Sequence, residues 1–190
     1  MSNSQFLTFR IIAIILAIGG ALHGQEGSAA KKLTSAVETA AKDKSFQPTS
    51  ELTFCNKFVS KIVKDILGDE EAKVVDGKSA NQQFEALEKS KAWKAVAITQ
   101  DSLSDAHKSA NKGTIVLAAY KDPAGGHGHI AVVVPADALE KSGKWGLKLP
   151  FIGQAGKTVF PKKKLSYGFS AAKKPKMKLF FYTGKEKPKP

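Results

Sequence analysis

The chain has 190 residues, a formal net charge of +13 at neutral pH and a single cysteine. This length is enough for one domain with a buried core and is short for two. One cysteine excludes an internal disulfide, and the strongly basic balance favours an anionic partner over a cationic one.

Residues 1–24 have the organisation of a secretory signal peptide. Arg10 is followed by the apolar run 11–18 and then by a segment of small or polar residues that ends at Gly24. A basic start, a short apolar core and a small-residue exit are typical of such peptides, and the core is about half as long as a membrane span. We therefore expect export to the periplasm or beyond the cell, with cleavage after Gly24. A retained N-terminal anchor is the alternative.

The rest of the chain divides into three parts. Residues 25–48 are small, polar and rich in alanine, which predicts a flexible lead with a weak helix near Leu33–Ala41. Residues 49–184 are expected to form the folded domain. Residues 185–190 are expected to form a basic, disordered tail.

The first strong helical pattern runs from Thr53 to Gly68, which we predict as N-cap and stop. On this basis Cys55 lies in the first turn, where unpaired N–H groups and the helix dipole favour the thiolate. A cysteine used as a small buried hydrophobe is the alternative. The apolar residues that recur every four positions, as in a helix with one buried face, are Phe54, Phe58, Ile62 and Ile66.

Two shorter helical patterns follow, from Phe84 towards Trp93 and over Asp101–Asn111. After Gly113 the pattern becomes that of strands, with runs rich in β-branched residues. Helices first and strands after predict an α+β fold with an antiparallel sheet. The strands are expected at residues 114–120, 130–134, 149–156, 164–170 and 177–182.

The positive charge is concentrated in the last fifty residues. Residues 141–190 carry 14 lysines and one acidic residue, whereas residues 25–140 carry 15 lysines and 16 acidic residues. We expect this lysine-rich C-terminal region to attract a polyanion such as an anionic cell-wall polymer, a membrane surface or nucleic acid. The alternative is a solvated lysine surface without a specific partner. Nucleic acid is the least favoured partner, because the interleaving of aromatic and basic residues used by single-strand binders is nearly absent.

Two histidines, His127 and His129, stand at the start of the predicted strand 130–134, behind a glycine-rich turn. A histidine held rigidly at a strand start is suited to act as the general base for a cysteine nucleophile. The alternatives are a metal site, because residues two apart on a strand point to the same face, and a purely structural role. No further metal ligand is indicated by the spacing. An unpaired thiol in an exported chain is easier to understand if it does chemistry.

Two short motifs resemble a known family. Residues 55–59 (CNKFV) open a helix, and residues 128–133 (GHIAVV) open a strand, in the order and separation seen in papain-like cell-wall hydrolases of the CHAP (cysteine, histidine-dependent amidohydrolase/peptidase) and NlpC types. The resemblance covers roughly residues 51–182. It implies a papain-like α+β fold, with the nucleophile at a helix start packed on a C-terminal antiparallel sheet. It also implies hydrolysis of amide bonds in peptidoglycan peptides through an acyl-enzyme, with no cofactor.

By position, the resemblance makes Cys55 the nucleophile, His129 the base and Gln154 the residue that orients the imidazole. The NlpC pattern usually has Asp before and Ser after the cysteine, and this chain has Phe54 and Asn56, which favours a CHAP-like or divergent relative. The expected partner is the cell-wall peptide that serves as substrate. We expect the protein to be a monomer. The alternatives are a non-catalytic cationic module that binds the cell wall, and a metal-dependent amidase that uses His127 and His129.

Overall fold

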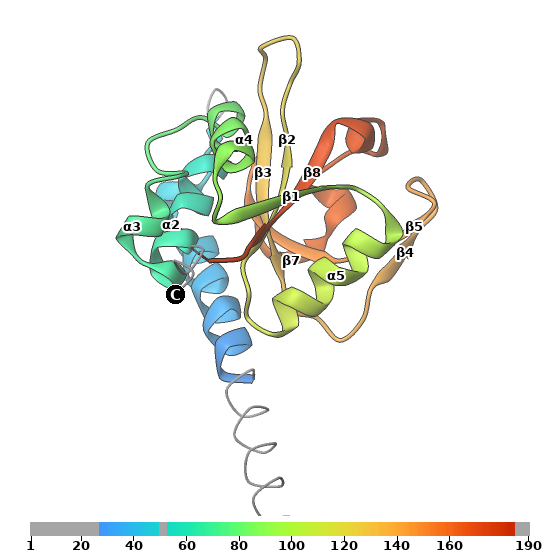
Figure 1. Cartoon of the computed structure of the whole chain (residues 1–190), viewed down its shortest axis with the longest axis horizontal. Coiled ribbons are helices and arrows are strands. Elements are labelled where there is room, and N and C mark those ends of the chain that lie inside the picture. Colours follow the sequence, from blue (N-terminus) through green and yellow to red (C-terminus); the bar gives the residue numbers. More distant parts are fainter. Residues whose placement is uncertain (1–26, 50–52, 185–190) are drawn as a thin grey trace, which may run out of the picture.

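The computed structural model describes residues 27–49 and 53–184. Its centre is a six-stranded sheet in the order β1-β8-β2-β3-β6-β7 (Figure 1), and each neighbouring pair is antiparallel. The predicted α+β class with an antiparallel sheet is therefore confirmed at this level. A separate hairpin joins β4 (Glu140–Ser142) to β5 (Leu147–Leu149). The strands of the main sheet are β1 (Trp93–Ala97), β2 (Val116–Tyr120), β3 (His129–Val134), β6 (Phe151–Ala155), β7 (Val159–Lys164) and β8 (Met177–Tyr182).

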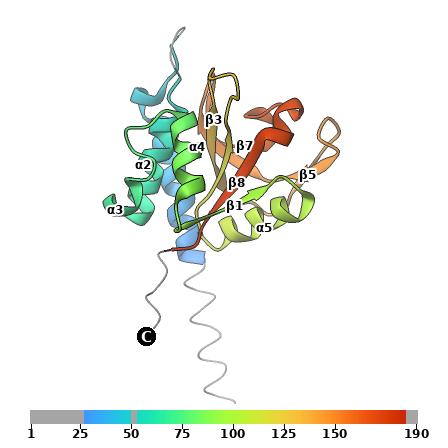
Figure 2. The ribbon, with the colours of Figure 1, turned by 45° about the horizontal axis from the view of Figure 1, so that its top comes forward.

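Helices cover both faces of the sheet. Figure 2 shows α2 (Cys55–Leu67) and α4 (Ala80–Lys89) on one side, and α5 (Gln100–Asn111) on the other. Strand β3 explains why this works, because its alternate residues belong to two separate cores. Ile130 and Val132 pack in the core with α2 and α4, whereas Ala131 and Val133 pack in the core with α5. A strand segment buried on both faces must be apolar throughout, as residues 130–134 of β3 are.

The predicted helix at Cys55 is confirmed, with one correction at its start. Gly68 ends α2 with a φ of 96°, which favours glycine. The N-cap is Phe54 rather than Thr53, and its side chain makes no capping hydrogen bond. The short helix α3 (Asp69–Ala72) follows directly.

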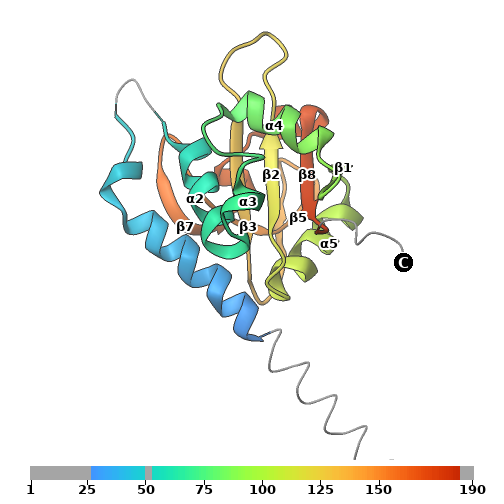
Figure 3. The ribbon, with the colours of Figure 1, turned by 60° about the vertical axis from the view of Figure 1, so that its left-hand side comes forward.

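The N-terminal lead differs from the expectation of a flexible segment. Residues 27–42 are helical (Figure 3), and residues 44–46 form the short 3-10 helix η1 (Lys44–Phe46). Leu33, Val37 and Ala40 are fully or almost fully buried in the same core as α2, and Val37 lies against Gly153 of β6. Weak intrinsic helix propensity is overridden here by tertiary packing of one apolar face.

Three predicted elements need correction. The predicted strand 149–156 is divided at Pro150 into β5 and β6. Trp93 opens the edge strand β1 instead of closing a helix. The predicted strand 164–170 is wrong, because β7 ends at Lys164 and is followed by the 3-10 helices η2 (Leu165–Tyr167) and η3 (Ala171–Lys176). Pro161, which suggests a break, is tolerated in β7 because edge strands accept proline.

The predicted signal peptide (1–24) and the C-terminal tail (185–190) lie outside the described residues. Within the ranges that the structure describes, no helix combines the length and the apolar character that crossing a membrane requires.

The buried N-terminal helix leads to a stability prediction. Leu33→Ala should lower the free energy of unfolding by about 2–5 kcal/mol, because it removes a fully buried side chain and leaves a cavity. Glu38→Ala, on the exposed side of the same helix, is the matched control and should change stability by less than about 0.5 kcal/mol. Urea denaturation followed by circular dichroism measures both, and equal stability of the two variants would show that this helix is not part of the core.

Candidate active site

The Cys55 thiol lies at the point where α2 meets the centre of the sheet. The backbone N–H of Phe54 donates to the carbonyl of Ala155 in β6 at 3.1 Å, which fixes the helix start against that strand. Cys55 itself is buried, with 4% of its surface exposed. The backbone of Ile130, the second residue of β3, lies close enough to the thiol to oppose the rise of its pKa. The start of α2 therefore contacts the residues that directly follow Gln154 and His129.

His129 and Gln154 are joined by a hydrogen bond of 2.7 Å between Nε2 and Oε1. The Gln154 amide nitrogen donates to the carbonyl of Thr158 at 3.3 Å, which turns Oε1 towards the imidazole. Because Oε1 can only accept, Nε2 of His129 carries the proton, and Nδ1 is left as the ring nitrogen that can accept one. The structure thus brings together His129 and Gln154 in the arrangement expected of a base and its orienting residue.

No hydrogen bond joins the Cys55 sulfur directly to the His129 ring among the residues that the structure describes. Catalytic hydrogen bonds are often long or poorly aligned before substrate binds and tighten in the complex. The His129 ring contacts Phe169, which belongs to the core with α5, whereas Cys55 belongs to the core with α2, so the chemistry proposed below requires the imidazole to turn towards the thiol.

The electrostatics of the site favour neutral forms of both groups. Burial raises the pKa of the Cys55 thiol, and hydrogen bonding from the backbone of Ile130, Asn56 and Cys55 opposes this effect without overcoming it. The expectation that the helix start makes Cys55 a thiolate is therefore wrong for the free protein, because desolvation outweighs the helix terminus. Burial also lowers the pKa of His129, the Gln154 hydrogen bond raises it, and the nearby charge of Lys173 lowers it.

The segment from η2 to η3 closes over the imidazole. The ring of Phe169 lies 4.8 Å from the His129 ring, centroid to centroid. Gly168 leaves room for the Gln154 amide, since a Cβ there would clash with Oε1. Lys173 lies over Tyr120, with its ammonium 4.4 Å from the ring centroid, and Tyr120 is the cross-strand partner of His129. A cation is thereby placed beside the base.

Two polar side chains on α4, those of Asn81 and Gln83, form hydrogen bonds that hold segments next to the site in place. Asn81 bonds the carbonyl of Gly126 and the N–H of Asp122, which fixes the turn before His129. Gly128 in that turn approaches Asn81 and the backbone of Tyr120 so closely that a Cβ would clash. Gln83 is fully buried and donates to the carbonyl of Asn56, which anchors the first turn of α2.

The other two histidines in the described residues, His127 and His107, stand apart from this site. His127 is exposed and precedes β3, so the strand geometry assumed for a metal pair with His129 is not formed. His107 lies on α5, which packs on the other face of the sheet. Within the described part of the chain, no group of three or more His, Cys, Asp or Glu side chains could hold a metal ion.

Four residues that support the site are not indicated by any pattern in the sequence. Phe169 and Lys173 lie far from His129 in the chain, and no local pattern connects them. Gln83 and Asn81 sit at the start of α4, where polar residues usually face solvent. The burial of Gln83 follows only from the packing of α4 against α2.

The neighbours of His129 predict opposite pKa changes for two substitutions. Lys173→Gln should raise the pKa of His129 because it removes a nearby positive charge, and Gln154→Ala should lower it because it removes a hydrogen bond that favours the imidazolium. In the unchanged protein the ring should titrate below its ordinary value of about 6.5. NMR titration of the His129 ring resonances measures all three values.

Lys174→Gln is the matched control for charge and should leave that pKa near its starting value. An unchanged pKa in both Lys173→Gln and Gln154→Ala would contradict the geometry described above.

No protein-family model matches this chain, and no curated protein matches its sequence.

Proposed function

We propose that this protein is an exported cysteine hydrolase that cleaves amide bonds in peptidoglycan peptides through an acyl-enzyme on Cys55. The observation that carries the proposal is the hydrogen-bonded pair of His129 and Gln154, whose chain neighbours Ile130 and Ala155 lie against the start of the helix that Cys55 opens. The order nucleophile, base, orienting residue along the chain agrees with the papain-like resemblance of the two motifs.

The first half of the reaction forms a thioester. Nδ1 of His129 accepts the thiol proton as the Cys55 sulfur attacks the amide carbonyl carbon, and the carbonyl oxygen becomes an oxyanion. The backbone N–H of Cys55, in the first turn of α2 where no side chain caps the helix, donates to that oxyanion in the proposed mechanism. The imidazolium then gives its proton to the amide nitrogen, the carbon–nitrogen bond breaks and the amine leaves.

The second half returns the enzyme to its starting state. His129 accepts a proton from water, the hydroxide attacks the thioester carbonyl, and the Cys55 sulfur leaves and regains a proton from the imidazolium. The product is a carboxylic acid. Because both groups are neutral at rest, the thiol is deprotonated only when substrate is present, and Gln154 holds the ring in the required tautomer throughout.

The proposed substrate follows from the resemblance and from the charge of the chain. Residues 141–184 carry eleven lysines and no acidic residue. Two of these lysines form ion pairs with acids from other parts of the described chain, Lys164 with Glu140 and Lys178 with Glu88. The remaining positive charge supports attraction to an anionic wall.

The same lysines favour a second candidate, a cationic module that binds the wall without cleaving it. The two candidates differ in one measurable property, the release of peptide or amine from peptidoglycan. The metal-dependent alternative has less support, because no third ligand lies near His127 and His129 in the described residues.

Replacement of the nucleophile provides the first test. Cys55→Ala should reduce the release of soluble products from purified peptidoglycan by about a thousandfold or more, because no acyl-enzyme can form. Its circular dichroism spectrum should be unchanged, since a small buried residue replaces another. Iodoacetamide should inactivate the unchanged protein, and a chelator should not. Full activity of Cys55→Ala would reject the mechanism, and wall binding without any release would select the cationic module.

The orienting residue predicts a change in pH dependence. In the unchanged protein, kcat/KM should rise with pH along a limb set by His129, below about pH 6.5. Gln154→Glu keeps an acceptor next to Nε2 but adds a negative charge, so it should raise the pKa of His129 and move this limb to higher pH. Gln154→Ala should lower kcat by about 10²–10⁴-fold, whereas an equal pH profile in all three proteins would show that Gln154 does not act on His129.

A further inference from the structure

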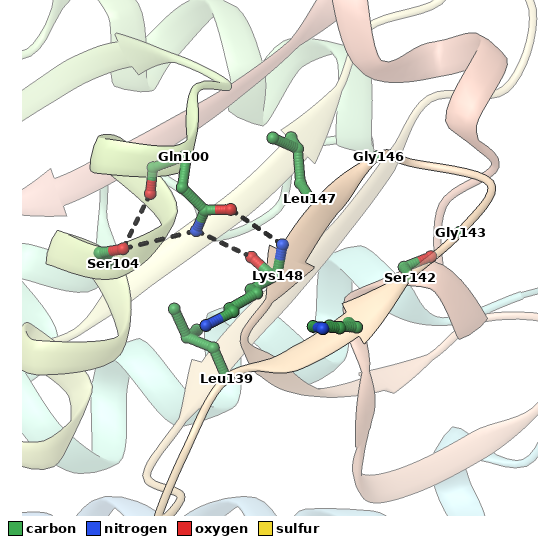
Figure 4. Close-up of a pocket in the computed structure, with 9 residues that line it drawn as sticks. Gln100, Ser104, Leu139, Ser142, Gly143, Gly146, Leu147 and Lys148 are labelled. Atoms are coloured by element: carbon green, nitrogen blue, oxygen red, sulfur yellow. Dashed lines mark hydrogen bonds between the residues drawn. The ribbon is translucent and has the colours of Figure 1, made fainter.

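A cavity of about 650 Å³ lies between α5 and the β4–β5 hairpin (Figure 4). We call it the hairpin cavity. Because α5 packs on the face of the sheet opposite to α2, the cavity is separate from the site around Cys55. Residues of α5 and of the hairpin with its flanking turn line the cavity. They are Gln100, Ser104, Leu139, Lys141, Ser142, Gly143, Gly146, Leu147 and Lys148.

Two lysines of the hairpin face each other in this cavity. Lys141 and Lys148 are directly opposite in the antiparallel register, so their side chains leave the same face of the hairpin. Like charges in this relation repel and destabilise a hairpin. Neither ammonium has an ion-pair partner among the described residues. The pair therefore presents two positive charges that nothing in the described protein neutralises.

The hairpin is held in place in spite of this repulsion. The Gln100 side chain accepts from the N–H of Lys148 at 2.8 Å and donates to the carbonyl of the same residue at 3.2 Å, as Figure 4 shows. On β4, the carbonyl of Lys141 accepts a hydrogen bond from the side chain of Lys164 in β7. Lys164 also forms an ion pair with Glu140 of β4. A two-stranded hairpin alone is marginally stable. These contacts hold the backbone of Lys148 against α5 and the backbone of Lys141 against β7 before any ligand binds.

We propose that the hairpin cavity binds a phosphate group, either free or within a polymer. A phosphate presents several anionic oxygens, so one group can accept from both ammonium groups and relieve their repulsion. Lysine is a compact point charge with three donors, which suits phosphate without the bidentate geometry that carboxylates favour with arginine. The Ser142 hydroxyl on the cavity wall is a further donor. This inference does not depend on the proposed hydrolase activity.

Binding of inorganic tripolyphosphate to the full protein, measured by calorimetry at low salt, tests the site. Lys141→Gln and Lys148→Gln should each weaken binding about tenfold, as expected for the loss of one charge-assisted hydrogen bond. Lys162→Gln and Lys163→Gln on β7 remove the same charge elsewhere and should weaken it less than twofold. Equal weakening by all four variants would overturn the proposal, because it would show diffuse attraction to the whole lysine surface.

Two further ligands identify the chemistry and its source. Polyglutamate of matched charge should bind at least tenfold more weakly than tripolyphosphate, and equal binding would overturn the assignment to phosphate. Poly(glycerol phosphate) that binds with the same dependence on Lys148 supports a polymer ligand, whereas binding of tripolyphosphate alone supports a free phosphate.

Thermal unfolding gives an independent readout. Without ligand at low salt, Lys141→Gln should raise the unfolding midpoint because it removes the cross-strand repulsion, and added salt should reduce this gain. Saturating tripolyphosphate should raise the midpoint of the unchanged protein more than that of Lys148→Gln. An unfolding midpoint in Lys141→Gln that is lower than in the unchanged protein would contradict the repulsion on which the inference rests.

Discussion

The hydrogen bond between His129 and Gln154 is the interaction on which the site depends. It joins the first residue of β3 to a buried residue of β6, and it can form only because these two strands are neighbours at the centre of the sheet. Three neighbouring groups keep the geometry of this hydrogen bond. Phe169 limits the movement of the imidazole, Gly168 leaves space for the amide, and the Thr158 carbonyl decides which end of that amide faces the ring.

Burial of the Cys55 thiol has an electrostatic cost. A cysteine at an exposed helix start would ionise more readily, but Cys55 lies under the helix in the core shared with β3. Burial therefore favours the neutral thiol of Cys55 and the neutral imidazole of His129. A neutral thiol is less prone to oxidation than a free thiolate.

The sequence predicts the parts of this fold whose patterns are local. The four-residue spacing in α2 and the continuous apolar run of β3 are examples, and the positions of Cys55 and His129 follow from them. Patterns fail where tertiary contacts decide. Leu33 and Val37 belong to a weakly helical segment that is stabilised by packing on the sheet, and the thiol pKa depends on burial that no motif encodes. The resemblance of the two motifs predicts a role for Gln154, whereas the contact of Phe169 with His129 depends on the fold of η2 and η3, which no motif encodes.

The edge strand β7 has a consequence for how an extended chain can approach the molecule. Pro161 lies where the pairing of β7 with β6 is irregular, and Lys162 and Lys163 are exposed beside it. An incoming peptide would gain little by adding to the sheet as a seventh strand. Recognition of any peptide on this side must therefore come from side chains and not from main-chain pairing, so selectivity there is set by residue type and not by the backbone that all peptides share.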